Sequence, residues 1–283
     1  MSPLRTPDVE AAVQAVLRRG YGLSFQHARA RIAPRAMWRD LTADAVLLSY
    51  PKCGRTWLRF LLGNALQARF GFEAEVGELM ELEGLRKHGA PWIRVTHDGH
   101  PDHLTPGELS RWTLRYLRKP VVFLVRDPRD AVVSLYYQHR FRELRFEGSL
   151  REFVFSDRSG LRTLISFYNA WTHRRRWTSR FLLVRYEDLK SDPTPEARRI
   201  LEFLGVPLSE SALEQAIDSS SFERMKALEA SGAAKNRLGG RDASSSKVRK
   251  GRVGGYREAL TPEDVQEADA IVRSELDPVY AYD

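Results

Sequence analysis

Several features are scarce or absent in this sequence, and each absence narrows the class of protein. Cys53 is the single cysteine among 283 residues, so no internal disulfide can form, which fits a reducing compartment. No apolar run approaches the ~18 residues that a membrane-spanning helix needs. The first residues, MSPLRTPDVE, contain no apolar segment of a secretory signal. We therefore expect a cytoplasmic protein without a transmembrane segment.

Motifs of several common classes are missing as well. There is no internal repeat, zinc-finger, RNA-recognition or heptad pattern, and no cluster of ligands that demands a metal ion. The net charge is nevertheless +8, with a pI of about 9.7. Such a charge suits nucleic acid, an anionic membrane or a small polyanionic ligand, and charge alone does not choose among them. We expect no metal and no nucleic-acid partner.

The pattern of apolar runs predicts the fold. Continuous apolar stretches, typical of central parallel strands, occur at 45–50, 92–97, 121–126 and 181–186. Helical patterns separate and follow them at 56–70, 127–141, 161–178, 194–204 and 262–275. A capping box at 105–108 predicts one more helix start. Alternating strands and helices predict a single α/β domain, a P-loop-like three-layer fold with a mostly parallel sheet between helices.

Two regions depart from this alternation. Residues 1–44 predict a helical leader that packs on the outside of the core or docks on a membrane or partner, before a domain that spans 45–283. Residues 231–255 have no hydrophobic period and are rich in glycine, serine and cations. A long loop of this kind inside a domain predicts a flexible segment that covers an anionic ligand.

The residues 50–57, YPKCGRTW, join the first strand to the first helix of the domain. A strand, a glycine-containing loop and a helix start form a typical phosphate cradle, because backbone N–H groups point at the anion. The usual nucleotide loop G-x-x-x-x-G-K-[ST] is absent, and Lys52 precedes Gly54. The alternative is an ordinary strand-to-helix turn with a solvated lysine.

A second segment, RDPRDAVVS at 126–134, follows another strand. The guanidinium of Arg126 and the hydroxyl of Ser134 together suit a phosphate monoester. The alternative is an ion pair of Arg126 with Asp127 or Asp130, beside an ordinary helix serine. Lys52, His97, Arg126 and Tyr186 all stand at predicted strand ends, where ligands of parallel sheets bind.

Taken together, these segments resemble the cytosolic sulfotransferase family. YPKCGRTW is similar to that family's 5′-phosphosulfate loop, YPKSGTTW, and RDPRDAVVS to its 3′-phosphate segment. Three more segments agree in order and spacing: YEDLKSDP at 186–193, SSSFERMK at 219–226 and RKG at 249–251. The resemblance covers residue 50 to about 257.

The resemblance implies a cofactor and the residues that bind it. The family transfers the sulfuryl group of 3′-phosphoadenosine 5′-phosphosulfate (PAPS) to a hydroxyl or amine by in-line displacement. Lys52 would contact the 5′-phosphate and the leaving oxygen. The loop residues around the 5′-phosphate would be Cys53, Gly54, Arg55 and Thr56. The adenine residues would be Trp57, Phe222, Tyr186 and Ser220. The 3′-phosphate residues would be Arg126, Ser134, Arg249, Lys250 and Gly251.

His97 is the predicted catalytic base. It ends a strand in RVTH, where the family has K-T-H, and a histidine of ordinary pKa contributes ~10²–10⁴-fold as a general base. The alternative is a structural histidine. Two alternatives stay open for Asp98: it orients His97, or it is only a turn residue. His100 and His103 line the acceptor pocket or lie on an exposed loop.

Two loop residues depart from the family pattern. Cys53 replaces serine, and it is either a redox-sensitive thiol or a small packing residue. Arg55 replaces threonine, and its side chain faces either the sulfate or the solvent. The family's dimerisation motif is not found. Loops 72–91, 98–105 and 139–160 would shape the pocket for a small-molecule, glycan or lipid acceptor.

Other functions compete with sulfuryl transfer. The first is a P-loop kinase of small substrates. The position of Lys52 before Gly54 argues against it, because the lysine of a kinase P-loop follows the glycines. The others are a basic nucleic-acid binder and a protein that binds PAPS without catalysis.

Overall fold

A computed structural model describes residues 42–109, 116–231 and 251–282. The predicted leader, apart from its last three residues, lies outside these ranges, as do residues 232–250 of the predicted covering loop. Both therefore stay predictions.

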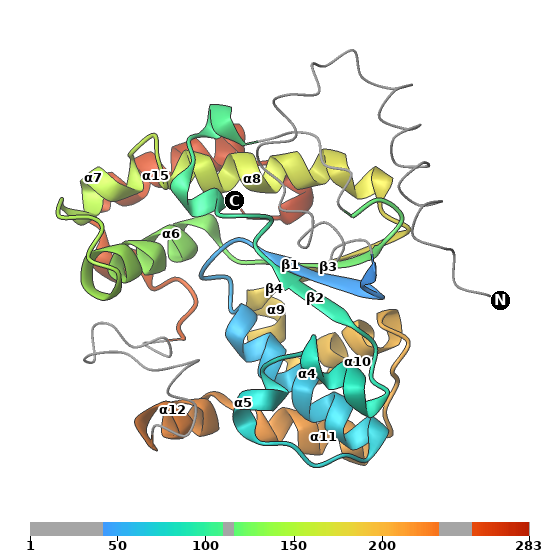
Figure 1. Ribbon diagram of the computed structural model, residues 1–283. Helices are drawn as coiled ribbons and strands as arrows, with labels where there is room; N and C mark the ends of the chain where they lie inside the picture. Colours follow the sequence, from blue (N-terminus) through green and yellow to red (C-terminus); the bar gives the residue numbers. More distant parts are fainter. Residues whose placement is uncertain (1–41, 110–115, 232–250, 283) are drawn as a thin grey trace. The chain divides into compact units, whose positions relative to one another are not determined.

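The predicted strands form one parallel sheet (Figure 1). The strands are β1 (Ala45–Ser49), β2 (Ile93–Thr96), β3 (Pro120–Val125) and β4 (Arg180–Arg185), in the order β2-β1-β3-β4. Every residue of β1 is buried, as is typical of a strand covered on both faces. All carboxyl ends lie at one edge of the sheet, which confirms the predicted parallel fold.

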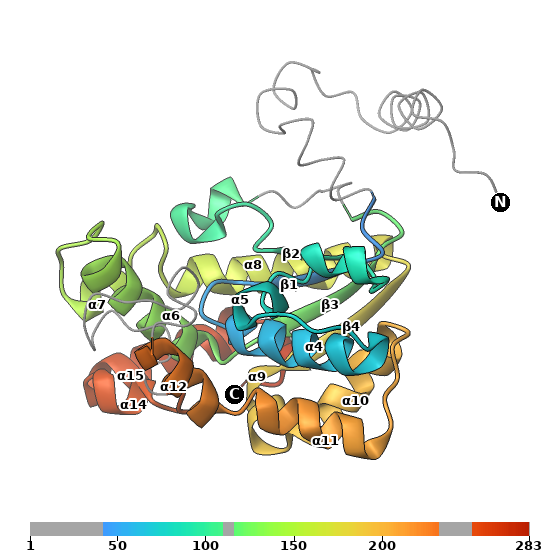
Figure 2. The same cartoon turned by 60° about the horizontal axis from the view of Figure 1, so that its bottom comes forward.

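Helices cover both faces of the sheet (Figures 1 and 2). One face carries α4 (Arg55–Phe70), α9 (Tyr186–Ser191), α10 (Pro193–Phe203) and α11 (Glu210–Ser219). The other carries α6 (Pro128–Tyr137), α8 (Leu161–Arg174) and α15 (Pro262–Glu275). Short helices are α5 (Val76–Leu79), α7 (Leu150–Val154), α12 (Phe222–Ser231) and α14 (Tyr256–Ala259). The single-turn segments are η1 (Gly84–His88), η2 (Pro101–His103), η3 (Pro106–Glu108), η5 (Arg175–Trp177) and η6 (Pro278–Tyr280).

One predicted helix is shorter than its pattern. The α-helical hydrogen bonds that begin after Asp127 end at Tyr137, and residues 138–142 form a π-helical turn, η4 (Gln138–Arg142). Such turns occur frequently at functional sites, because the extra residue re-aims the side chains that follow. The capping box at Thr105 is present, but the segment that it opens among the described residues is the single turn η3.

The core centres on Phe123 of β3. Its ring contacts Phe167, Tyr168 and Trp171 of α8, at centroid distances of 6.1, 5.7 and 5.8 Å. Burial of one such ring contributes about 1.5–3 kcal/mol. The ring of Tyr168 lies in this core, while its hydroxyl contacts the backbone of Arg126 at the end of β3. Within the described residues, no helix has the length and apolarity needed to cross a membrane.

Candidate active site

The loop after β1 has the backbone geometry of a phosphate cradle. Lys52 and Gly54 both have positive φ, 71° and 89°, and α4 begins at the next residue, Arg55. A Cβ on Gly54 would collide with the ring of Tyr186, so no other residue fits. Among the described residues, no side chain caps α4, and its first turn has no acidic residue. The first N–H groups of a 16-residue helix, Thr56 and Trp57 among them, are thus offered to an anion.

Cys53 fastens this loop to the end of β3. The side chain is fully buried, and its sulfur lies 3.2 Å from the hydroxyl of Tyr168. That hydroxyl donates to the carbonyl of Arg126 and accepts from its N–H, each at 2.9 Å. Burial raises the pKa of the thiol to about 12. These contacts favour the small packing residue over the redox-sensitive thiol.

Arg126 links three segments that are distant in the sequence. Its Nη1 donates to the carbonyl of Lys52 at 3.3 Å, and its Nη2 donates to the carbonyl of Arg252 at 2.7 Å. The guanidinium lies 4.7 Å from the centre of the Tyr186 ring. The ion pair with Asp130 that the sequence left open is present at 3.4 Å. The Nε atom of Arg126 is buried without a hydrogen-bond partner among the described residues.

Asp130 and Tyr186 hold the segment that follows residue 250. The buried carboxylate of Asp130 accepts the N–H groups of Gly254 and Tyr256 at 2.8 and 2.9 Å. The hydroxyl of Tyr186 donates to the carbonyl of Gly251 at 3.4 Å. Gly251 itself has a φ of 56° and lies flat against Phe222, where a Cβ would approach the ring to 2.5 Å. Gly251 therefore lies between two of the predicted adenine residues, while residues 249 and 250 lie outside the described ranges.

Trp57 and Phe222 flank one cation. The ammonium of Lys190 lies 5.8 Å from the Trp57 ring and 4.9 Å from the Phe222 ring. Trp57 also meets Tyr186 edge to face at 5.9 Å, and its buried Nε1 has no hydrogen-bond partner in the part of the chain that the structure describes. The structure thus brings together three of the four predicted adenine residues.

Two predicted cofactor residues are placed less directly. Ser220 is fully buried, and its hydroxyl donates to the carbonyls of Ala216 and Ile217 in the preceding helix. Ser134 lies half-buried on α6, two turns after Arg126.

His97 is held in one tautomer. Its Nδ1 donates to the carbonyl of Ser49 at 2.7 Å, so Nε2 carries the lone pair. Burial, followed by the positive charge of Arg55, lowers the pKa of His97 to about 3. The expectation of an ordinary pKa is therefore wrong: the imidazole is neutral at pH 7, as a base requires, but it is a weaker base than a free histidine.

Asp98 pairs with two other residues. Its carboxylate binds Arg174 at 2.6 Å and Tyr116 at 3.2 Å. The contact that fixes His97 is the carbonyl of Ser49. The sequence signal for Ser49 was its place at the end of β1, directly before the loop.

Gln138 is a site residue that the sequence did not indicate. The Nζ atom of Lys52 donates to its Oε1 at 3.2 Å, and its Nε2 donates to Glu143 at 2.6 Å. Gln138 opens the π-helical turn, which turns its amide toward the lysine. A regular helix pattern through residue 141 offered no reason to expect this.

The charge of Arg55 acts on His97. The side chain is half-buried, and burial together with the charge of Arg59 lowers its pKa to about 9. Its positive charge contributes to the low pKa of His97.

Comparison with known proteins decides the family to which this site belongs. The family model of the sulfotransferase domain matches residues 42–279. The chain belongs to this family. The resemblance drawn from the YPKCGRTW and RDPRDAVVS segments is confirmed, and the protein is an enzyme of the sulfotransferase class.

Individual sulfotransferases are similar over most of their length. A flavonol sulfotransferase-like protein of Flaveria bidentis is 28% identical over 264 residues, covering 83% of this chain and 82% of the relative. Rat sulfotransferase 1A1 is 28% identical over 210 residues, covering 67% and 68%.

Solved structures share the fold. Mouse sulfotransferase SULT7A1, complexed with PAP, has a TM-score of 0.59 at 23% identity, covering 82% of this chain and 83% of that one. Retinol dehydratase in complex with retinol and PAP has a TM-score of 0.60 at 18% identity, covering 83% and 82%. Both confirm the α/β fold of this sulfotransferase.

Proposed function

We propose that this sulfotransferase moves the sulfuryl group of PAPS to a hydroxyl or amine of a small-molecule acceptor, with Lys52 and His97 acting from two sides. The observation that carries the proposal is the junction at β1. The strand ends in Ser49, whose carbonyl fixes the tautomer of His97, and continues after two residues into Lys52. A base and a cation are thus fixed to one strand end.

The residues present fit the cofactor. A helix start without acidic residues or a capping side chain in the described part of the chain suits a 5′-phosphosulfate. The buried Nε1 of Trp57 and the close approach of Gly251 to Phe222 suit a slot for a flat heterocycle. PAP occurs in the related structures by their own description.

A 3′-phosphate would meet the Arg126 side of the site. The guanidinium of Arg126 is oriented by two backbone carbonyls, and the hydroxyl of Ser134 lies on the following helix. Arg249 and Lys250 are proposed to complete this group, from outside the described residues. A forked guanidinium suits a phosphate better than a single ammonium does.

PAPS supplies the sulfuryl group and a phosphate as the leaving group. The Nε2 atom of His97 takes the proton of the acceptor, since Nδ1 is already committed to Ser49. Lys52 donates to the oxygen on which negative charge develops, and Gln138 holds its ammonium in place. Both groups are set before the reaction, so little reorganisation is needed.

Arg55 favours an acceptor that carries negative charge. The side chain is half-buried, and its positive charge acts on His97 while that of Arg59 acts on it. The exposed arginine Arg151 does not add to this preference, because it pairs with Asp264 and Glu267. We propose a small acceptor with a carboxylate, sulfate or phosphate, and a cytoplasmic setting like that of the cytosolic sulfotransferases among its relatives.

Incubation with ³⁵S-labelled PAPS and matched acceptor pairs, each with and without a carboxylate, tests the proposal. We expect labelled product, tight binding of PAP by calorimetry, and preference for the acidic member of each pair. A thermal shift with ATP and Mg²⁺ but none with PAP would instead indicate a kinase. PAP binding without any product would indicate a binding protein.

A further inference from the structure

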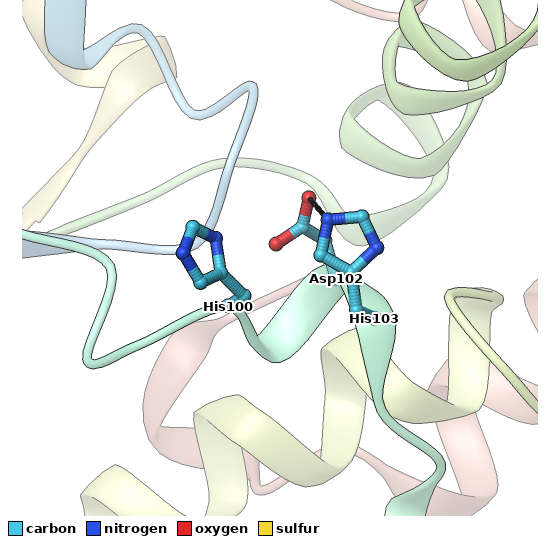
Figure 3. A group of neighbouring side chains, drawn as sticks. All are labelled: His100, Asp102 and His103. Carbon is cyan, nitrogen blue, oxygen red and sulfur yellow. Dashed lines mark ion pairs between the residues drawn. The ribbon is translucent and has the colours of Figure 1, made fainter. Parts of the chain in front are cut away.

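Two loops bring a cluster of histidines and carboxylates together beside His97. Asp102 and His103 stand in η2, after β2, while His139 and Glu143 belong to the π-helical turn after α6 and to the residue that follows it. Figure 3 shows Asp102 between the rings of His100 and His103. The sequence pattern does not indicate this cluster, because its members come from two segments about 40 positions apart.

His103, His139 and Glu143 offer ligand atoms that all lie within 4.8 Å of one another, and Asp102 belongs to a second such group with His100 and His103. Oδ2 of Asp102 lies 3.7 Å from Nε2 of His103 and 3.6 Å from Nε2 of His139. The latter atom lies 3.9 Å from Oε2 of Glu143. These separations exceed the range of a hydrogen bond. Two ligands on one tetrahedral zinc ion, each at about 2.0–2.1 Å, lie about 3.3–3.4 Å apart.

Two of these atoms have no hydrogen-bond partner within the described ranges. They are Nε2 of His139 and Oε2 of Glu143, both buried, and the residue His139 is only 4% exposed. Buried polar atoms in native proteins nearly always have a partner, because the loss of water is otherwise uncompensated. Oε2 of Glu143 lies 3.5 Å from Nη1 of Arg145 and 3.9 Å from Nε2 of His139, so one metal ion in place of that guanidinium would satisfy both unpartnered atoms.

The surrounding residues hold the ligands in the form that binds metal. Arg145 donates to Nε2 of His103 at 3.1 Å, so that nitrogen carries a lone pair. The other oxygen of Glu143 accepts from Gln138, which fixes the carboxylate, as outer partners do in metal sites. The side chain of Arg145 is 58% exposed and can turn into solvent when an ion takes its place.

We infer that Asp102, His103, His139 and Glu143 bind a divalent transition-metal ion, with Zn²⁺ as the ion that the set fits. Two imidazoles and two carboxylates are zinc ligands, whereas Mg²⁺ and Ca²⁺ require a shell of oxygen atoms. His100 has a ligand atom within 4.8 Å of those of Asp102 and His103, and can serve as a further ligand. This inference departs from the expectation of no metal and does not rest on the proposed reaction.

Titration of the untagged full chain with Zn²⁺ by calorimetry tests the site, and Co²⁺ absorption reports its coordination. We expect one ion per chain at micromolar concentration or below, and the intense visible bands of four-coordinate Co²⁺. His139→Gln and Asp102→Asn should each weaken binding about 10–100-fold or more. His88→Gln is the matched control, since His88 stacks on Phe72 and pairs with Glu78 elsewhere.

Arg145→Ala gives a second, opposite readout. It removes a competing donor and a positive charge from the site, so Zn²⁺ should bind more tightly. Circular dichroism checks the fold of each variant, and Glu143→Gln replaces any variant that fails to fold. Absence of binding in the wild type, or equal binding in the ligand variants, would overturn the inference. So would an anomalous zinc peak in a crystal at any other place.

Discussion

The Arg126 side of the site and its His97 side are built in opposite ways. On the first, Arg126, Asp130 and Tyr186 each contact backbone from another part of the chain, and the C-terminal segment is locked onto α6. On the second, His139 and Glu143 keep buried atoms without hydrogen bonds among the described residues, and Arg55 stands beside another cation. The first side is therefore preorganised by the chain itself, while the second is completed by molecules that the chain binds.

His97→Asn is expected to have the largest effect on activity, and it should lower catalysis without changing the binding of PAP. Loss of the general base should lower kcat by about 10²–10⁴-fold. Affinity for PAP should remain, because the substituted side chain still lies away from Arg126. Labelled-sulfate kinetics and calorimetry measure the two quantities. His173→Asn on the exposed surface of α8 is the control. If PAP affinity fell together with kcat, the two sides of the site would not act independently, and the comparison would be wrong.

The single cysteine allows a test of how firmly the loop is fastened. Burial raises the pKa of Cys53 from 9.0 to about 12, so the reactive thiolate forms only at strongly alkaline pH. At pH 8 the native thiol should react with iodoacetamide about 10³-fold more slowly than the unfolded thiol. Mass spectrometry follows the adduct, with the urea-unfolded chain as reference. Equal rates in both states would contradict the lock between loop and core.

Arg126→Lys weakens the preorganised side without removing its charge. A lysine cannot keep both carbonyl contacts and a forked contact to phosphate, which are worth about 1.5–3 kcal/mol as charged hydrogen bonds. PAP affinity should fall about 10–100-fold in calorimetry. Arg180 lies at the first residue of β4, at the sheet edge opposite to Arg126, so Arg180→Lys should bind PAP like the wild type. If both variants behave alike, the fork of Arg126 has no special role.

Arg55→Thr should have the smallest effect, which is a change in the pKa of His97. Removal of a positive charge favours the protonated imidazole, so the pKa of His97 should rise from about 3 toward its ordinary 6.5. Histidine NMR titration measures it, and the acidic limb of kcat/KM should move to higher pH. Arg69→Thr, on the exposed last turn of the same helix, is the control. A downward shift would place Arg55 elsewhere.

The sequence predicted which residues meet on the Arg126 side, because they lie in short segments at strand ends. Apolar runs located all four strands of the described sheet, and the parallel order follows from the helices between them. Lys52, Arg126 and Tyr186 then meet at one edge of the sheet. Asp130 was considered only as an ion-pair partner, since nothing in RDPRD shows that its carboxylate binds backbone 124 positions later.

The His97 side could not be predicted to the same depth. A π-helical turn has the same residue types as the α-helix that it continues, so hydrophobic periodicity does not reveal it. The positions of Gln138 and His139 depend on that turn. The partner of His97 is a backbone carbonyl, which any residue at position 49 offers.

The contacts of Gly251, Arg252 and Gly254 also bear on the order in which the protein is made. Synthesis proceeds from the N-terminus, and domains fold as their chain emerges. The sheet and its strand-end residues are complete by residue 186, yet the carbonyls that bind Tyr186 and Arg126 come from residues 251 and 252. A ribosome-bound chain therefore acquires its sheet early and its nucleotide site only at the close of translation, so a truncated product can fold around the sheet and still fail to capture the nucleotide.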